Sequence, residues 1–223
     1  MDRIYYIYLG IFFIIFLIIF YVLYFVKDGS KTSLIASKVN LSKDVNDLKF
    51  NTAQKPESAI YSYSMNVLVE GVLNNIDTDY IKKYYLFYRN ADVTNFVESA
   101  WTIANHGKNI GLRLDPADLT KLWLDYTVGT NTSAAYKTVE IVNNFPISKW
   151  TNVIVTVDNA NINVYIDSKL VKSVNGSLAI PSPTNPIKFS HFKAYLADFR
   201  YYNSIINPEI PLMSRILGIN AVN

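Results

Sequence analysis

The chain has 223 residues, with 21 Lys or Arg against 18 Asp or Glu, so its formal net charge is +3. This weak and scattered positive charge, without any run of four basic residues, argues against a nucleic-acid partner. There is no cysteine, which excludes disulfides and zinc sites with Cys ligands and favours a domain that faces the cytosol.

The first feature along the chain is an apolar run over residues 4–26, which contains no charged side chain. As a helix it would extend about 34 Å, against about 30 Å for the hydrocarbon core of a bilayer. A cleaved signal peptide would have a shorter apolar region followed by a small-residue cleavage site, and this run has neither. Residues 1–26 are therefore predicted to be a transmembrane anchor, with tyrosines near both interfaces. Its lipid contacts are expected from Ile4, Tyr5, Tyr8, Phe12, Phe16, Phe20, Tyr24 and Val26.

The flanks of this run give a weak indication of orientation. Lys27, Lys31 and Lys38 follow it, whereas Arg3 precedes it, and an excess of positive charge marks the cytosolic side. The C-terminal domain is therefore expected on that side. Glycosylation sequons do not decide the question, because three of them are expected by chance in a chain so rich in Asn; they begin at Asn40, Asn131 and Asn175.

Residues 27–57 are predicted to form a stem. Leu34, Leu41, Val45 and Leu48 would line one face of a helix. The stem is therefore either a short amphipathic helix or a solvated spacer, and the sequence leaves both alternatives open.

From residue 58 the hydrophobic period changes to two, which is typical of β-strands. Nine runs of 5 to 12 residues are rich in Val, Ile, Tyr and Thr and are bounded by turn residues. They cover residues 59–70, 83–89, 110–114, 122–128, 138–143, 151–158, 162–166, 169–174 and 192–202. This spacing predicts an all-β antiparallel sandwich or jelly roll over residues 58–215, followed by a tail over 216–223.

Within this domain, residues 150–174 read as a three-strand meander. Asn and Asp occupy the turn at 158–161, and Asp167 and Ser168 occupy the second turn. The segment 165–171 resembles the strand of concanavalin A-like, laminin-G-like jelly rolls that ends in Tyr-Ile-Asp-Gly, with Ser168 in place of the usual Gly. Similar matches occur in order at residues 61–67, 85–89, 109–116 and 197–210. The resemblance covers residues 58–212 and implies the concanavalin A-like fold.

The anchored arrangement also resembles predicted jelly-roll proteins of large nucleocytoplasmic DNA viruses. Several such viruses have an internal membrane beneath an icosahedral capsid. This resemblance implies a virion membrane protein or minor capsid protein.

No catalytic motif is evident. Glucanases that this fold resembles carry Glu-x-Asp-x-x-Glu on one strand, which brings two carboxylates together, and that spacing is absent here. The two histidines, His106 and His191, have no motif around them. The glutamates are isolated from other carboxylates at that interval; they include Glu57, Glu70, Glu98, Glu140 and Glu209. The chain is therefore predicted not to be an enzyme and to need no cofactor.

Calcium is the one ion for which candidate ligands exist, because loop carboxylates bind it in related jelly rolls. The candidates are Asp77, Asp79, Asp115 and Asp118, although each of them fits an Asx turn or a cap better than a calcium ligand. Trp101, Trp123 and Trp150 would form a platform for a sugar if they were exposed.

Three functions are compatible with these features of the sequence. The leading hypothesis is a non-enzymatic, membrane-anchored structural protein that links the internal membrane of a virion to the capsid shell, with its C-terminal domain facing the capsid. Its partners would be the lipid bilayer and capsid or other virion proteins. The alternative is a lectin-like attachment protein, which predicts exposed Trp or Tyr beside a polar groove that binds glycans. The third, an unrecognised glycoside hydrolase, predicts two carboxylates converging on the concave sheet.

Overall fold

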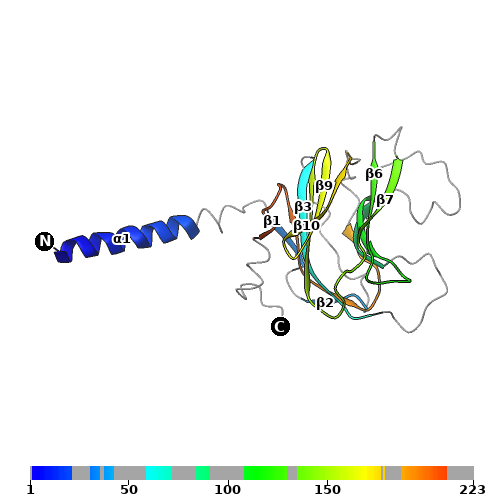
Figure 1. The fold of residues 1–223 in the computed structure, drawn as a ribbon, viewed down its shortest axis with the longest axis horizontal. Helices are drawn as coiled ribbons and strands as arrows, with labels where there is room; N and C mark the ends of the chain where they lie inside the picture. Colours follow the sequence, from blue (N-terminus) through cyan, green and yellow to red (C-terminus); the bar gives the residue numbers. More distant parts are fainter. Residues whose placement is uncertain are drawn as a thin grey trace. The chain divides into compact units, whose positions relative to one another are not determined.

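The computed structural model describes residues 2–21, 31–35, 38–42, 59–71, 84–90, 108–129, 135–176, 178 and 187–209. The chain divides into two compact units, Met1–Lys31 and Thr32–Asn223. Figure 1 shows the described helix of the first unit and the β-strands of the second.

The first unit contains helix α1, Asp2–Tyr21. Its large apolar side chains between Tyr8 and Ile19 are 48 to 68 % exposed within the chain. Among the residues that the structure describes, no helix is long and apolar enough to cross a membrane. Of the predicted lipid contacts, Tyr24 and Val26 lie outside the described residues.

The second unit is a sandwich of two antiparallel sheets, which are seen as two layers in Figure 1. Sheet A has the strand order β1-β12-β3-β8-β9-β10, and β2 also pairs with β12. Its strands are β1 Lys31–Ile35, β2 Val39–Asn40, β3 Ile60–Val69, β8 Thr151–Asp158, β9 Asn161–Ile166, β10 Lys169–Asn175 and β12 Ala194–Tyr202. Sheet B has the order β11-β4-β5-β6-β7. Its strands are β4 Tyr84–Asn90, β5 Lys108–Leu114, β6 Leu122–Val128, β7 Ala135–Val142 and β11 Ile187–Lys188. The antiparallel sandwich predicted from the sequence is confirmed.

The structure differs from the prediction in the segment expected to be a stem. Residues 31–35 and 39–40 are strands that join sheet A at the edge provided by β12, not part of an amphipathic helix. Ile35 is 5 % exposed and Leu41 is fully buried, so their burial in the core, rather than helical periodicity, explains the apolar positions there. The sandwich therefore begins before residue 58. Val45 and Leu48 lie outside the described residues.

The core lies between the two sheets and follows from the alternation along the strands. In β3, the side chains of Tyr61, Tyr63 and Met65 are at most 1 % exposed. Tyr63 packs against Phe87 of sheet B, with ring centroids 4.9 Å apart, and is stacked on Phe199 at 6.0 Å. Burial of each large apolar side chain contributes about 1.5–3 kcal/mol, so this aromatic cluster holds the two layers together.

The predicted turns of the meander are confirmed. Asp167 and Ser168 both have positive φ, 46° and 68°, as a two-residue type I′ hairpin between β9 and β10 requires. This conformation accounts for the Gly that related jelly rolls carry at the position of Ser168. Here the Ser168 hydroxyl donates to the carbonyl of Pro208 at 2.8 Å.

That hydrogen bond fixes one end of the segment 203–209, called the strap below. The strap follows β12 and crosses the outer face of sheet A. The Ser62 hydroxyl donates to the Ser204 carbonyl at 2.7 Å, and Ile206 packs on Ile154 and Tyr202. The outer face of sheet A is therefore partly covered by the protein's own chain.

Candidate ligand-binding face of sheet B

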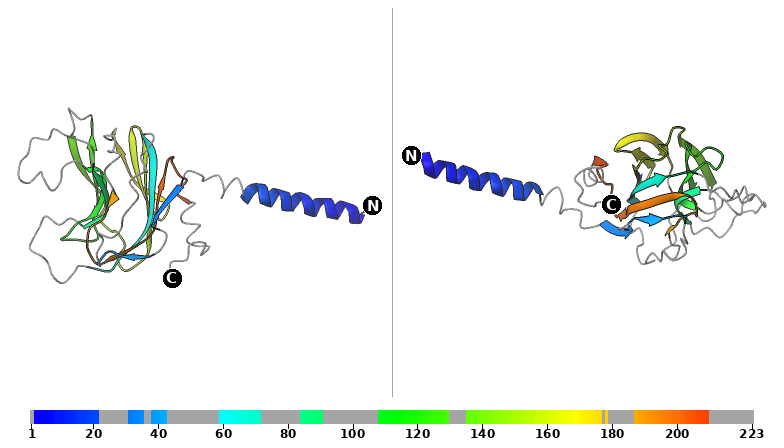
Figure 2. Two further views of the ribbon diagram at one scale, coloured as in Figure 1. Left: turned by 180° about the vertical axis from the view of Figure 1, so that it is seen from behind. Right: turned by 90° about the horizontal axis from the view of Figure 1, so that it is seen from below.

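The outer face of sheet B carries polar and aromatic side chains in an otherwise apolar sheet. This sheet is curved, and its concave side faces away from sheet A (Figure 2). Adjacent strands lie about 4.8 Å apart, and the strand registers place the outward residues in rows across the sheet. One row contains Tyr85, Arg113, Trp123 and Glu140, and the next contains Tyr88, Gly111, Asp125 and Thr138. These residues, with Thr127 and Tyr136 beyond them, are called the sheet B face.

Asp125 is the centre of this face. Its side chain is fully buried, yet it is surrounded by donors rather than by apolar groups. It accepts hydrogen bonds from the Tyr85 hydroxyl at 2.6 Å, from Arg113 Nε at 2.8 Å and from the Thr138 hydroxyl at 2.7 Å. An ionised carboxylate accepts only, and it suits three donors of which one is a cation. The face therefore contains a paired, internally satisfied charge.

Tyr85 reaches Asp125 because of a glycine on the neighbouring strand. A Cβ at Gly111 would lie 2.8 Å from Cε1 of Tyr85, so the tyrosine ring occupies the space that a side chain would take. Burial is the main cause that raises the pKa of Tyr85, and the negative charge of Asp125 raises this pKa further. The Tyr85 hydroxyl therefore stays protonated and donates to the carboxylate.

Arg113 links the buried charge to an aromatic surface. Asp125 holds its Nε, and its guanidinium carbon lies 5.4 Å from the centroid of the Trp123 ring. The side chain of Arg113 is 11 % exposed, and Trp123 is half-buried. Ion pairing and the cation–π contact together fix the orientation of the guanidinium.

Two polar atoms of this face lack hydrogen-bond partners in the described part of the chain. They are Nε1 of Trp123 and Oγ1 of Thr127, and both atoms are buried. Thr127 itself is 0 % exposed. Buried polar atoms are almost always paired, so these two atoms have hydrogen-bonding capacity that the described residues leave unused.

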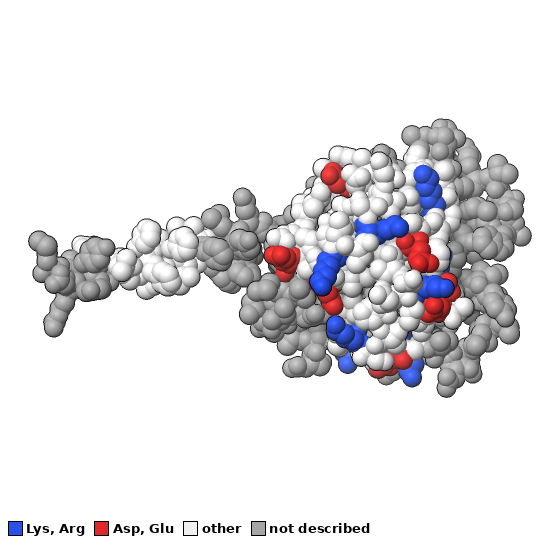
Figure 3. Space-filling view, viewed as in Figure 1, with Lys and Arg blue, Asp and Glu red and all other residues white. Residues whose placement is uncertain are grey.

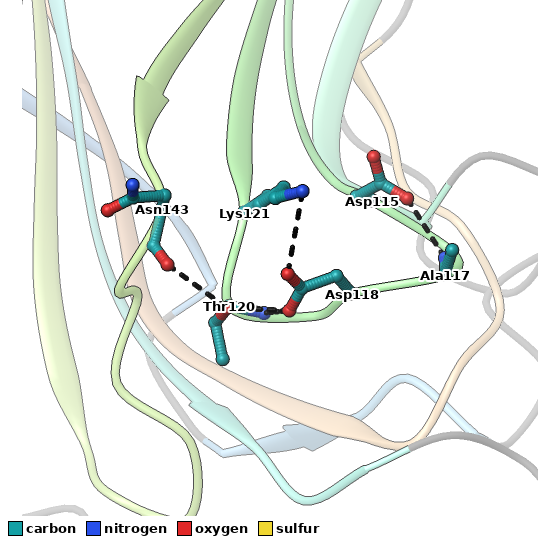
Figure 4. Close-up of polar contacts among 6 residues, drawn as sticks. All are labelled: Asp115, Ala117, Asp118, Thr120, Lys121 and Asn143. Atoms are coloured by element: carbon teal, nitrogen blue, oxygen red, sulfur yellow. Dashed lines mark hydrogen bonds and ion pairs between the residues drawn. The ribbon is translucent and has the colours of Figure 1, made fainter.

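The sequence-based candidates for calcium lie elsewhere. Asp115 and Asp118 belong to the loop between β5 and β6 (Figure 4), and Asp115 accepts from the amide of Ala117. Asp118 accepts from the amide and the hydroxyl of Thr120, and these hydrogen bonds lower the pKa of Asp118. Both aspartates thus form Asx turns. No group of three His, Cys, Asp or Glu that could hold a metal occurs among the described residues.

Asp77 and Asp79 lie outside the described residues, as do Trp101, His106, Glu57 and Glu98. His191 is exposed, and its Nε2 lies 2.5 Å from the carbonyl oxygen of Ser42.

Trp123 and Glu140 were among the residues considered from the sequence as candidates for a site, whereas Arg113 and Asp125 were not. Glu140 is opposite Trp123, and Thr138, two residues earlier, is opposite Asp125. The two carboxylates are thus diagonal neighbours on adjacent strands, although Glu140 appears isolated along the chain. A signal was present, because Arg113 and Asp125 are single charges within apolar strand segments.

On the side shown in Figure 3, basic and acidic side chains of the described residues are interspersed, and neither sign forms a continuous patch there.

A curved antiparallel sandwich with a polar and aromatic outer face defines a lectin-like jelly-roll domain. The model of the concanavalin A-like lectin/glucanase superfamily, of the laminin G type, matches residues 88–209, which is more than half of the chain. The protein belongs to this family, and the resemblance noted in its sequence is confirmed.

Solved structures with a similar fold include binding domains of botulinum neurotoxins. The binding domain of serotype G is 17 % identical, with 72 % of this chain and 37 % of that chain covered and a TM-score of 0.46. The serotype D ligand-binding domain, solved with N-acetylneuraminic acid, is 12 % identical, with 82 % and 40 % covered and a TM-score of 0.45. A structure of botulinum neurotoxin type C, whose cell entry depends upon interaction with two ganglioside molecules, is 15 % identical, with 70 % and 35 % covered and a TM-score of 0.42.

The chain thus spans less than half of the length of each of these structures. A comparison with curated proteins gives no match.

Proposed function

We propose that the protein is a non-enzymatic, membrane-tethered lectin-like domain that binds a glycan on the sheet B face. The observation that carries this proposal is the oriented guanidinium of Arg113 beside the ring of Trp123. Asp125 holds Arg113 in place, and Nε1 of the half-buried Trp123 lacks a hydrogen-bond partner in the described part of the chain. Sugars combine polar edges with apolar faces, and they suit a surface that combines aromatic rings with a few fixed polar groups.

The arrangement of the carboxylates supports binding without hydrolysis. Glycosidases need one carboxylate as an acid and another as a nucleophile or base. Asp125 is the only acidic group near Glu140 on the sheet B face among the described residues, and it is fully buried and occupied by three donors. A carboxylate in this state orients Arg113 and Tyr85, but it cannot reach a glycosidic bond.

The membrane tether is proposed from the sequence, with support from α1. The run of uncharged residues over 4–26 extends five residues beyond the end of the helix at Tyr21. The described side chains of α1 are apolar and exposed, and such a helix needs an apolar environment. Only four residues, 27–30, lie between this run and the start of β1 at Lys31, so the tether would be short.

The link between a virion membrane and a capsid, which was predicted from the sequence, stays a prediction. The same holds for capsid partners, for localisation at an internal virion membrane and for calcium. No contact in the described structure favours a protein partner over a glycan, and the glycan proposal therefore comes first.

The test is glycan binding by the full-length protein in detergent micelles or nanodiscs. An array of oligosaccharides is probed with the wild type, with Trp123→Ala and with Tyr195→Ala, a control that removes a half-buried aromatic side chain from sheet A. We expect binding that Trp123→Ala lowers at least tenfold and that Tyr195→Ala leaves unchanged. Equal loss in both variants, or no binding by folded wild type, would overturn the proposal. Release of reducing sugar from a bound oligosaccharide would refute the non-enzymatic part alone.

A further inference from the structure

We infer that the ligand of the sheet B face is a neutral sugar rather than an acidic one, an inference that rests on the proposed glycan binding. It comes from the order of charges across one row of the face. Arg113 of β5 is opposite Trp123 of β6, which is opposite Glu140 of β7. The row therefore places a cation and an anion on either side of an indole ring, about 10 Å apart at the backbone.

The net charge of the face opposes an anionic ligand. The positive charge of Arg113 is already paired with Asp125 at 2.8 Å. The charge of Glu140 is left over, because Glu140 is half-buried and has no ion pair or hydrogen bond in the described part of the chain. A sugar carboxylate or sulfate bound near Trp123 would therefore meet an uncompensated negative charge in a partly desolvated site, where like charges repel more strongly than in water.

The hydrogen-bonding groups point to the same class of ligand. Arg113 Nη and Trp123 Nε1 can only donate, and an ionised Glu140 can only accept. A sugar hydroxyl both donates and accepts, so adjacent hydroxyls of one pyranose ring can satisfy donors and acceptor together. A carboxylate has no hydrogen to give and would leave Glu140 without a partner, which is costly in a half-buried position.

The aromatic side chains complete the fit. Trp123, Tyr88 and Tyr136 are half-buried, and the Tyr88 ring lies against Tyr85, with their centroids 4.9 Å apart. The C–H face of a neutral pyranose packs on such rings without losing hydrogen bonds. The Glu140 carboxylate is then the group that selects for hydroxyls, and it is a specificity-determining residue.

The inference is tested by calorimetric titration of the full-length protein in nanodiscs. The probes are neutral oligosaccharides of galactose, glucose, mannose and N-acetylhexosamines, and the same oligosaccharides carrying sialic or uronic acid. Glu140→Gln removes the charge and keeps the size of the side chain. Glu209→Gln makes the same change at an exposed position on the strap and serves as the matched control.

We expect the wild type to prefer neutral probes, and Glu140→Gln to weaken their binding by roughly 5- to 10-fold, because the Gln amide oxygen still accepts a hydrogen bond but without the contribution of the charge. The same variant should bind acidic probes more tightly, and Glu209→Gln should change neither. Tighter binding of acidic probes by the wild type, unaffected by Glu140→Gln, would overturn the inference and leave the proposed function standing. Absence of binding to every probe, with the fold intact by circular dichroism, would overturn both.

Discussion

Gly111 gives the most direct test of how the sheet B face is built. In Gly111→Ala, the new methyl group would lie 2.8 Å and 3.2 Å from two atoms of the Tyr85 ring and 3.1 Å from Cβ of Tyr88. These distances are too short for carbon atoms, so the Tyr85 ring has to move. Moving it breaks the hydrogen bond from Tyr85 to Asp125, which is 2.6 Å long.

The magnitude follows from two costs and one gain. Overpacking costs about 1–3 kcal/mol, and loss of a hydrogen bond to a charged group costs about 1.5–3 kcal/mol. Alanine is favoured over glycine within a strand by about 0.5–1 kcal/mol. We therefore expect Gly111→Ala to lower the free energy of unfolding by about 2–5 kcal/mol, measured by urea denaturation.

A double-mutant cycle shows whether the effect passes through Tyr85. In a Tyr85→Leu background the aromatic ring and the hydroxyl are both absent, so Gly111→Ala should cost less than 1 kcal/mol by the same reasoning. Additive costs in the double variant would refute the idea that the glycine exists to admit the Tyr85 ring.

Three further predictions concern the turns and the core. Ser168→Gly removes the strain of a positive φ and also the hydrogen bond to Pro208, each worth about 1 kcal/mol. Because the two effects oppose each other, we expect little change in stability but faster proteolysis within the strap. Unchanged cleavage would contradict the role of Ser168 in anchoring the strap. Burial raises the pKa of Tyr61 and of Tyr63, so their contribution to stability is complete below about pH 10 and is lost above it. Absorbance at alkaline pH should show these tyrosines ionising only as the domain unfolds. Ionisation before unfolding would refute their burial. Hydrogen bonds from Thr120 lower the pKa of Asp118, so the contribution of Asp118 to stability is present above about pH 4 and is lost as the pH falls. Asp118→Asn should therefore make the melting temperature depend less on pH in the acidic range. An unchanged pH profile would contradict this prediction.

The sandwich fold could be predicted from the sequence because most of its strands have a local pattern of alternating residues. In β3 and β8, alternate side chains face the core, and this alternation is visible along the chain. The strands β1, β2 and β11 were missed because β2 and β11 have only two residues each and the sequence of β1, KTSLI, shows no alternation of polar and apolar residues. They exist because a neighbouring strand offers an unpaired edge, and that edge is a property of the tertiary structure.

The candidate site could be predicted only in part for a related reason. A search for carboxylates at fixed spacing along one strand cannot find Asp125 and Glu140, which lie on neighbouring strands. The pairing of Arg113 with Asp125 likewise depends on the register between β5 and β6. Register is set by packing and turns over the whole sheet. The sequence therefore gives the residue types of the site but not which of them lie side by side on neighbouring strands.

The proposed binding explains the pairing of Arg113 with Asp125 better than stability does. Desolvation of a buried ion pair offsets most of its attraction, and apolar residues of similar volume often stabilise a protein as well or better. The inner side of sheet B is packed with apolar residues in this way, and Leu112 and Leu124 are fully buried there. On the outer side the chain instead places a charge that orients Arg113 and, through Tyr85, fixes an aromatic ring over Gly111. On this face a buried charge, which is unfavourable in itself, holds neighbouring side chains in fixed positions. Such an arrangement is the one expected of a binding surface.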